Sequence, residues 1–298
     1  MKLGLSTYSL DGEISSGRMT LGDVLDWIAA NGGECAELVP FAYQFEKDGV
    51  IDHESIRQTV RRAKDAGIEL VNYSVLADLC KTGEDLEKEV QRICLHVDIA
   101  AELGLPRMRH DVCAFRRPHG ENTLQDFERW LPVIVEGASR ICEYAQKRGL
   151  MTMIENHGFF CNGMDRVERI LNGVHSANYG LLLDTGNIVC MDEDPSVASM
   201  RLAKRTNMVH LKDFYIRKRD PGDTTLFDCG GHWFRSSAGR YLRGAILAQG
   251  DLDIWEILAA LKSSGYDGNI AIEFEGLEDA KYASLVSLQN ARRIWEEV

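Results

Sequence analysis

Four apolar runs in the second half of the chain end in side chains that commonly bind metal ions. The four are Glu155 in MTMIENHG, Asp184 in LLLDTGN, His210 in VHLKD and Glu273 in IAIEFEG. Three carboxylates withdrawn from water in one place repel one another unless a cation or protons compensate. A carboxylate-rich set with one imidazole suits hard or borderline divalent ions. We therefore expect one divalent metal ion, with Mn²⁺ as the first choice and Mg²⁺, Co²⁺ or Zn²⁺ as alternatives.

These runs belong to a longer series of short apolar segments that alternate with segments of helical periodicity. Eight candidate strands span residues 2–8, 35–40, 68–74, 107–112, 150–156, 179–185, 207–213 and 269–275. Such alternation predicts a parallel sheet in the α/β class. A doubly wound sheet usually has fewer strands and a GxGxxG turn after the first one, which this chain lacks. We predict a single (β/α)8 TIM barrel domain over residues 1–298.

The barrel fold explains why the four ligand candidates would meet. Active sites of such barrels lie at the carboxyl ends of the strands. The four residues end four consecutive predicted strands, so they should face one another across the rim. One long irregular insertion, from residue 214 to about 251, separates the seventh strand from its helix, and connections of that length are usually functional.

Composition limits the function classes. A formal net charge of −12 works against nucleic-acid binding, which needs a basic surface. We find neither a membrane-spanning run nor a secretory signal, and expect a cytoplasmic protein without a membrane partner. The eight cysteines contain no CxxC pair, which predicts reduced, mostly buried thiols rather than disulfides or a structural zinc site.

The chain resembles, over essentially its whole length, the sugar isomerase/epimerase branch of the xylose isomerase-like TIM barrels. The motifs that carry the resemblance are IENH, LLLDTGN, VHLKD and GYDGNIAIEFEG. The resemblance implies that Glu155, Asp184, His210 and Glu273 bind one divalent metal. It also implies that Glu155 and Glu273 are catalytic and move protons. A ketose or keto-sugar would then be isomerised or epimerised through a metal-stabilised enediolate.

The substrate contacts are expected to differ from those of the ketose 3-epimerases in this family. Many of them carry a histidine three residues after the sixth-strand aspartate, where this chain has Asn187. We expect Asn156 and Asp213 to orient the histidine ligand or its loop. The candidate substrate-binding residues near the rim are His110, His157, Asn187, Lys212 and Glu275.

The insertion adds two further candidates. Trp233 could stack on a bound sugar ring, and Arg243 could contact its hydroxyls or an acidic substituent. The same composition suits a subunit contact equally well, and we expect a homo-oligomer.

Three alternatives stay open at this stage. The same metal site could serve a lyase or dehydratase acting on a keto-inositol or a 3-keto-glycoside, because the enolate chemistry is shared. An endonuclease IV-type repair enzyme would need further histidines, where this chain has Asn72 and Asn187. The remaining class is a sugar-sensing scaffold without enzymatic activity.

Overall fold

The eight predicted strands form a closed parallel barrel in the computed structural model, which describes residues 1–115, 117–225 and 231–298. The first and last strands pair through Leu3 and Ile270, which closes the ring. The predicted TIM barrel is therefore confirmed. In barrel order the strands are β1 (Lys2–Ser6), β2 (Cys35–Leu38), β5 (Glu69–Val75), β6 (Arg107–His110), β7 (Met151–Glu155), β8 (Tyr179–Asp184), β9 (Thr206–Leu211) and β13 (Asn269–Ile272).

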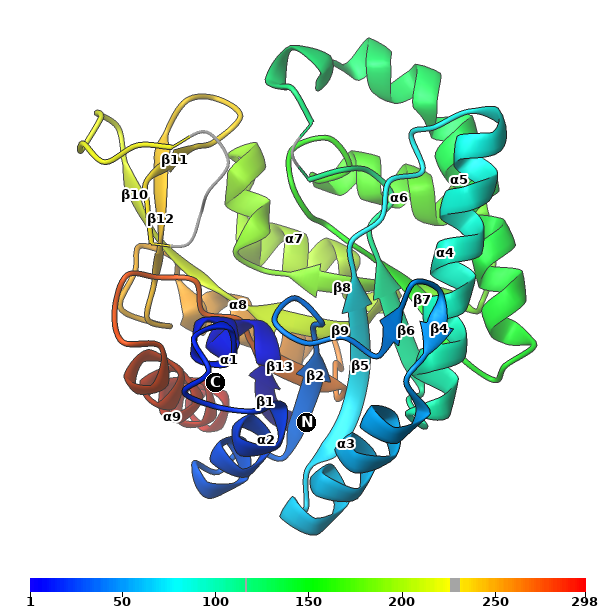
Figure 1. The fold of residues 1–298 in the computed structure, drawn as a ribbon. Coiled ribbons are helices and arrows are strands. Elements are labelled where there is room, and N and C mark those ends of the chain that lie inside the picture. The colour runs from blue at the N-terminus through cyan, green and yellow to red at the C-terminus, as the bar shows by residue number, and fades with distance from the viewer. Residues whose placement is uncertain (116, 226–230) are drawn as a thin grey trace.

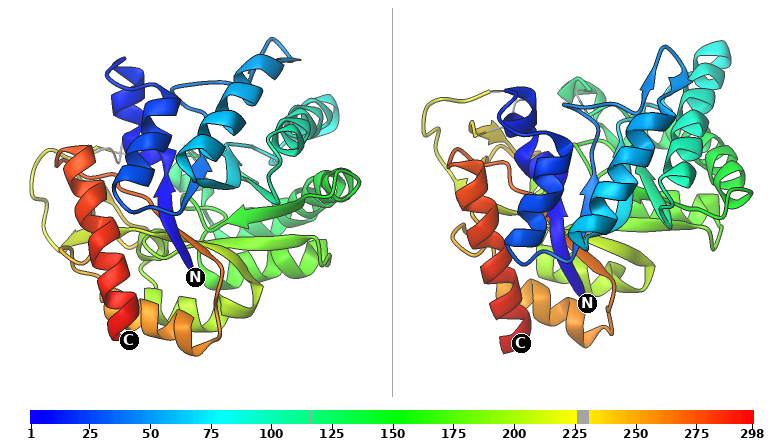
Figure 2. Two further views of the ribbon diagram at one scale, coloured as in Figure 1. Left: turned by 90° about the horizontal axis from the view of Figure 1, so that it is seen from below. Right: turned by 60° about the horizontal axis from the view of Figure 1, so that its bottom comes forward.

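Helices surround the strands, and both chain ends lie at the amino ends of the barrel strands (Figures 1 and 2). The α-helices are α1 (Asp11–Ser15), α2 (Leu21–Ala30), α3 (His53–Ala66), α4 (Gly83–Glu102), α5 (Leu124–Gln146), α6 (Met164–Val174), α7 (Pro195–Leu202), α8 (Ile254–Ser263) and α9 (Ala280–Glu297). Short 3-10 turns are η1 (Thr7–Leu10), η2 (His119–Glu121), η3 (Asn187–Met191) and η4 (Ala203–Arg205). Within the described residues, no helix has the length and apolarity needed to cross a bilayer.

An apolar layer fills the middle of the barrel and supports the rim above it. It is a separate buried cluster of Cys35, Val71, Met153, Leu182, Met208 and Ala271. Side chains two residues apart on a strand point to the same face. The inward-facing positions one layer higher on β7, β8, β9 and β13 therefore belong to Glu155, Asp184, His210 and Glu273, two residues beyond Met153, Leu182, Met208 and Ala271.

The insertion is not irregular, as the sequence suggested, but forms a three-stranded antiparallel sheet beyond one end of the barrel (Figure 1). Its strands are β10 (Asp213–Arg217), β11 (Phe234–Arg235) and β12 (Tyr241–Ala245), and a small hairpin of β3 (Glu46–Lys47) and β4 (Val50–Ile51) lies elsewhere. The sheet is hard to read from sequence because β10 follows β9 with one residue between them. Residues 226–230 of the insertion lie outside the part of the chain that the structure describes.

Two residues fix this sheet to the barrel. The Asp213 carboxylate accepts hydrogen bonds from the backbone N–H groups of Phe214 at 2.7 Å and Gly250 at 2.9 Å, which ties together both ends of the insertion. Gly244 of β12 bridges to Gly276, just beyond Glu275. A Cβ atom at Gly244 would lie 2.4 Å from the Glu275 carbonyl oxygen, so only glycine permits this approach. The insertion thus packs beside the carboxyl end of β13.

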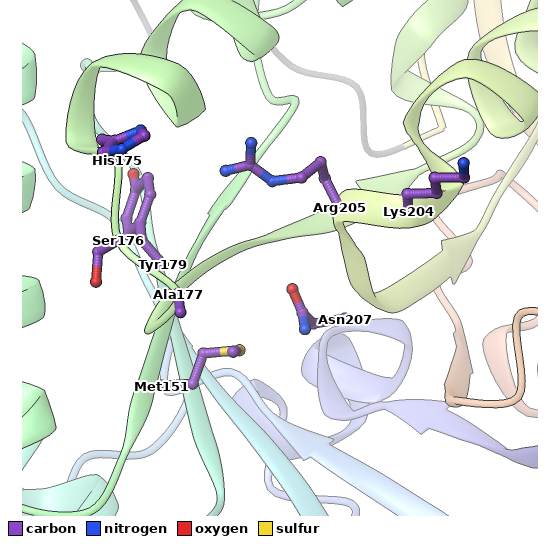
Figure 3. A pocket seen from close by; sticks show the side chains of 8 residues that line it. All are labelled: Met151, His175, Ser176, Ala177, Tyr179, Lys204, Arg205 and Asn207. Carbon is purple, nitrogen blue, oxygen red and sulfur yellow. The ribbon is translucent and has the colours of Figure 1, made fainter.

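A pocket of about 380 Å³ opens at the other end of the barrel (Figure 3). Met151 and Tyr179 stand at the amino ends of β7 and β8, and Lys204 and Arg205 lie just before β9. In barrels the amino-terminal face usually serves stability rather than chemistry. This pocket is therefore separate from the rim that carries the ligand candidates.

Candidate active site

The four predicted metal ligands converge at the carboxyl end of the barrel. Each offers one ligand atom, and these atoms all lie within 4.8 Å of one another. Asp184 and His210 are direct neighbours in the register of β8 and β9, while Glu155 ends β7 and Glu273 follows β13. Their convergence follows from barrel closure, which brings the ends of β7, β8, β9 and β13 to one rim.

The His210 imidazole is oriented toward the three carboxylates by a residue from the opposite part of the chain. Its Nε2 lies 2.7 Å from Glu37 Oε2, a carboxylate that only accepts, so Nε2 carries the proton. Its Nδ1 lies 3.7 Å from Glu155 Oε1 and makes no hydrogen bond. A buried lone pair without a donor is what a metal-binding histidine requires, and the carboxylate behind it fixes the tautomer.

The electrostatics at His210 favour the binding of a cation. Burial disfavours the imidazolium, but Glu37 and then Glu273 outweigh it and raise the pKa of His210 well above its usual value. Asp184 Oδ2, which is also buried, lies 3.8 Å from Nδ1. A divalent ion between these atoms would satisfy both of them and replace the proton on Nδ1.

Negative charge exceeds fixed positive charge in this region. Among the residues that the structure describes, the permanent cations that pair with these carboxylates are Arg109 and Lys212. Six carboxylates surround them, namely Glu37, Asp111, Glu155, Asp184, Glu273 and Glu275, and none of their side chains is more than 11% exposed. Uncompensated buried carboxylates are costly, so the donor set fits a divalent cation.

Lys212 extends its ammonium group into the carboxylate cluster. Its Nζ lies 2.6 Å from Glu273 Oε2, 3.2 Å from Asp184 Oδ2 and 3.3 Å from Glu275 Oε1. Burial opposes the charge, but Asp184 followed by Glu273 raises the pKa of Lys212 well above its usual value. The predicted substrate candidates Lys212 and Glu275 are therefore placed at the cluster, where Lys212 is a fixed cation.

Arg109, Asp111 and His157 form a second network on the other side of Glu155. Arg109 Nη2 lies 2.6 Å from Glu155 Oε2 and 2.7 Å from Asp111 Oδ1. These two carboxylates use both Nη2 hydrogens, so His157 Nδ1, 3.1 Å from Asp111 Oδ1, must itself be the donor to Asp111. Burial lowers the pKa of His157, but Asp111 outweighs this effect and raises it.

Two asparagines position the ligands through hydrogen bonds. Asn187 donates from Nδ2 to Glu155 Oε1 at 3.1 Å and from its backbone N–H to Asp184 Oδ1 at 2.8 Å. Asn156 exchanges two 2.8 Å hydrogen bonds with the backbone of Asp184. Asn187 therefore stands against the proposed ligands, and Asn156 holds the ends of β7 and β8 together.

His110 is not brought into the cluster. Its Nδ1 donates to the Asp111 carbonyl oxygen at 2.8 Å, and its ring lies 6.2 Å, centroid to centroid, from that of Tyr179. The alternation of side chains along β6 explains the difference, because Arg109 points inward to Glu155 and its neighbour therefore points outward. Substrate contact by His110 thus finds no support in this geometry.

Burial of His110 predicts a loss of stability in mild acid. Its pKa is lowered from 6.5 to about 4, so below pH 6.5 the unfolded chain takes up a proton that the folded protein refuses. Stability is full at pH 7 and falls by about 1.4 kcal/mol per pH unit down to pH 4 from this group. In urea unfolding at pH 7 and pH 5, His110→Asn should reduce the pH dependence. The exposed His53→Asn should not, and equal slopes in all three proteins would contradict the assignment.

Trp233 and Arg243 pair with each other on the insertion. The Arg243 guanidinium lies 5.2 Å from the Trp233 ring centroid and 5.1 Å from that of Tyr215. Arg217 also stands over Trp233, at 5.8 Å. The expected sugar contact by Trp233 and Arg243 therefore stays a prediction, since the arginines take up the aromatic faces here.

Three residues of the site were not identified from the sequence, namely Glu37, Arg109 and Asp111. All three lie at or just beyond strand ends at inward positions. Arg109 and Asp111 lie two and four residues after Arg107 and therefore share its face of the strand. Glu37 lies two residues after Cys35, which points into the barrel. Strict two-residue alternation at the ends of the second and fourth predicted strands would have selected them.

Comparison with known proteins places the chain in a family. The profile described as "Xylose isomerase-like TIM barrel" matches residues 25–293, and the chain belongs to this family. It is similar to an inosose dehydratase of Bacillus velezensis, with 26% identity over 272 residues that cover 88% of this chain and 84% of the relative.

Two solved structures share the fold. A probable 3-DHS dehydratase, AsbF, from Bacillus anthracis superposes with a TM-score of 0.74 at 19% identity, covering 97% of this chain and 98% of that one. A D-psicose 3-epimerase from Clostridium cellulolyticum H10 gives 0.74 at 14% identity, with 99% of both chains covered. The proteins similar to this chain thus include dehydratases and epimerases. The sequence relative favours the dehydratase alternative over the isomerase or epimerase that we expected first.

Proposed function

We propose that the protein is a divalent-metal-dependent dehydratase that removes water from a cyclic β-hydroxy ketone of the keto-inositol class. The observation that carries the proposal is the Asp111–His157 pair beside Glu155. An epimerase needs only two groups that exchange a proton with carbon. A dehydratase also needs an acid that protonates the departing hydroxyl, and the raised pKa of His157 suits that task.

Glu155, Asp184, His210 and Glu273 would hold the metal. His210 Nδ1, which makes no hydrogen bond, supports this assignment, and Mn²⁺ stays our first choice for an oxygen-rich set. When bound, the ion acts as a Lewis acid toward the substrate carbonyl. Arg109 and Asn187 fix both oxygens of Glu155, so this residue keeps its orientation while substrate enters.

Two residues would divide the proton transfers. Glu273 removes the proton from the carbon next to the carbonyl, since it has the most exposed side chain of the four proposed ligands, at 11%. The electron pair of that C–H bond forms the new C=C bond as the β C–O bond breaks. His157 gives its proton from Nε2 to the leaving hydroxyl, which departs as water. Asp111 holds the His157 imidazole in place in both its protonated and its neutral state. The product is an α,β-unsaturated ketone.

The test separates proton removal from loss of water. Metal-loaded protein is incubated in D2O with inososes and with 3-dehydroshikimate, and both enone absorbance and deuterium at the α carbon are measured. His157→Gln should reduce enone formation by about a hundredfold, the scale of one general acid, while deuterium exchange continues. His53→Gln, which removes a surface histidine paired with Glu102, should change neither rate.

Two results would overturn the proposal. Equal loss of both rates in His157→Gln would mean that His157 acts in the removal of the proton from carbon or is needed for folding. Deuterium incorporation into a recovered epimer, without any enone, would establish the epimerase that the placement of Glu155 and Glu273 in one cluster also permits.

A further inference from the structure

A second group of metal-binding side chains lies outside the barrel centre. Asp78 and Cys80 belong to the β5–α4 loop, Cys113 to the β6–α5 loop and Cys161 to the β7–α6 loop. These three connections follow neighbouring strands, so they meet at the same rim. Asp78, Cys80 and Cys113 each offer one ligand atom, and these atoms lie within 4.8 Å of one another.

Cys161 completes the group through Cys113. The Cys113 side chain interacts with those of both Cys161 and Cys80, which makes it the centre of the three sulfurs. Cys113 is 7% and Cys161 3% exposed, while Asp78 and Cys80 are half-buried. The three cysteines are free thiols. An ion could therefore enter from the side of Asp78 and Cys80.

The surroundings favour ionised sulfur at this point. Arg117 brings a positive charge that favours the thiolate form of Cys113. The Arg117 guanidinium is held nearby, 4.4 Å from the Phe160 ring centroid. A thiolate, not a thiol, is the form of cysteine that binds metals.

We propose that Cys80, Cys113, Cys161 and Asp78 form a second metal site that takes Zn²⁺. Three sulfurs and one carboxylate oxygen make the tetrahedral, thiolate-rich set that zinc prefers and that manganese or magnesium does not. A disulfide is the competing outcome, but it would use only two of the three sulfurs, whereas Asp78 accepts backbone hydrogen bonds from Cys80 at 3.1 Å and Ala114 at 3.2 Å in either case. The site differs in ligand type from the barrel cluster, which contains no cysteine.

The position of this site gives it a structural role. Cys113 lies two residues after Asp111, and Cys161 lies four residues after His157, on the same two loops. Zinc would join these loops to the β5–α4 loop and so limit the motion of the Asp111–His157 pair. A closed tetrahedral zinc site stabilises folding directly and needs no open coordination position.

Cobalt substitution tests the proposal independently of enzymatic activity. Co²⁺ bound to thiolates gives an intense near-ultraviolet charge-transfer band, which oxygen and nitrogen ligands do not give. The full-length protein titrated with Co²⁺ should show this band with one ion per chain, and Zn²⁺ should abolish it. The double variant Glu155→Gln/Asp184→Asn, altered only in the barrel cluster, should keep the band.

Variants of the cysteines complete the test. Cys113→Ser should lose the band and bind one zinc fewer per chain, and the half-buried Cys80→Ser should weaken zinc binding by at least about tenfold. The matched control Cys142→Ser, a buried cysteine beside Ser176, should retain both properties. Three results would overturn the proposal. They are absence of the band in the folded wild-type protein, persistence of the band in Cys113→Ser, and a disulfide between two of the three cysteines in protein that was purified under reducing conditions.

Discussion

Glu155→Gln is expected to reduce turnover by about a thousandfold or more and to weaken divalent metal binding by more than about a hundredfold. Both oxygens of Glu155 have a hydrogen-bond donor or a cation as a partner. Oε2 lies 2.6 Å from Arg109 Nη2, and Oε1 accepts from Asn187 Nδ2 at 3.1 Å while facing His210 Nδ1. An amide has one donor end, so either orientation directs an NH2 group at Arg109 or at the metal position. It also leaves the buried Arg109 with one carboxylate partner instead of two.

The measurement combines single-turnover kinetics with metal titration by calorimetry. Glu13→Gln is the matched control, because Glu13 is also a buried glutamate bound to an arginine, Arg18, at 2.7 Å but outside the cluster. It should lose some stability and keep both metal affinity and turnover. Near wild-type turnover in folded Glu155→Gln would exclude Glu155 from the proposed chemistry.

Lys212→Met should have opposite effects on metal binding and on turnover. The ammonium lies 3.2 Å from Asp184 Oδ2 and 2.6 Å from Glu273 Oε2, so it repels a cation bound by the same oxygens. The repulsion between this ammonium and a divalent ion at such distances costs about 1–4 kcal/mol of binding free energy in a partly screened site. Removing the ammonium should therefore tighten divalent binding by about tenfold or more, whereas turnover falls about a hundredfold because substrate loses a positioned cation.

Thermal unfolding with and without metal gives the clearest reading of this variant. Without metal, Lys212→Met removes the ammonium that compensates Asp184, Glu273 and Glu275, so the midpoint should fall. With metal, much of the loss should be restored, which makes the metal-induced shift larger than in the wild type. Lys281→Met, which removes a lysine 3.7 Å from Glu13, should leave that shift unchanged. Weaker metal binding in Lys212→Met would show that the lysine supports the ion rather than competing with it.

The positions of the four ligand candidates could be read from the sequence because they depend on local pattern. An apolar run marks a buried strand, and a carboxylate or imidazole at its end marks the rim of a parallel barrel. Glu155, Asp184, His210 and Glu273 each carry that signal, and the structure gathers them. Their metal-binding role stays a prediction. His110 was selected by residue type alone, and the pleat of β6 directs it away from the rim.

What the sequence determined by itself was the order of strands and helices, the closed barrel and the rim to which the charged strand ends belong. These features follow from periodicity, which acts over a few residues. Only the tertiary structure decided the contacts around them. Glu37 lies behind His210, which is 173 positions away along the chain. The ammonium of Lys212 lies among three carboxylates, and three cysteines without any CxxC spacing come together in one place. Such contacts depend on which side chains from distant segments the closed barrel brings together, and no local pattern specifies that.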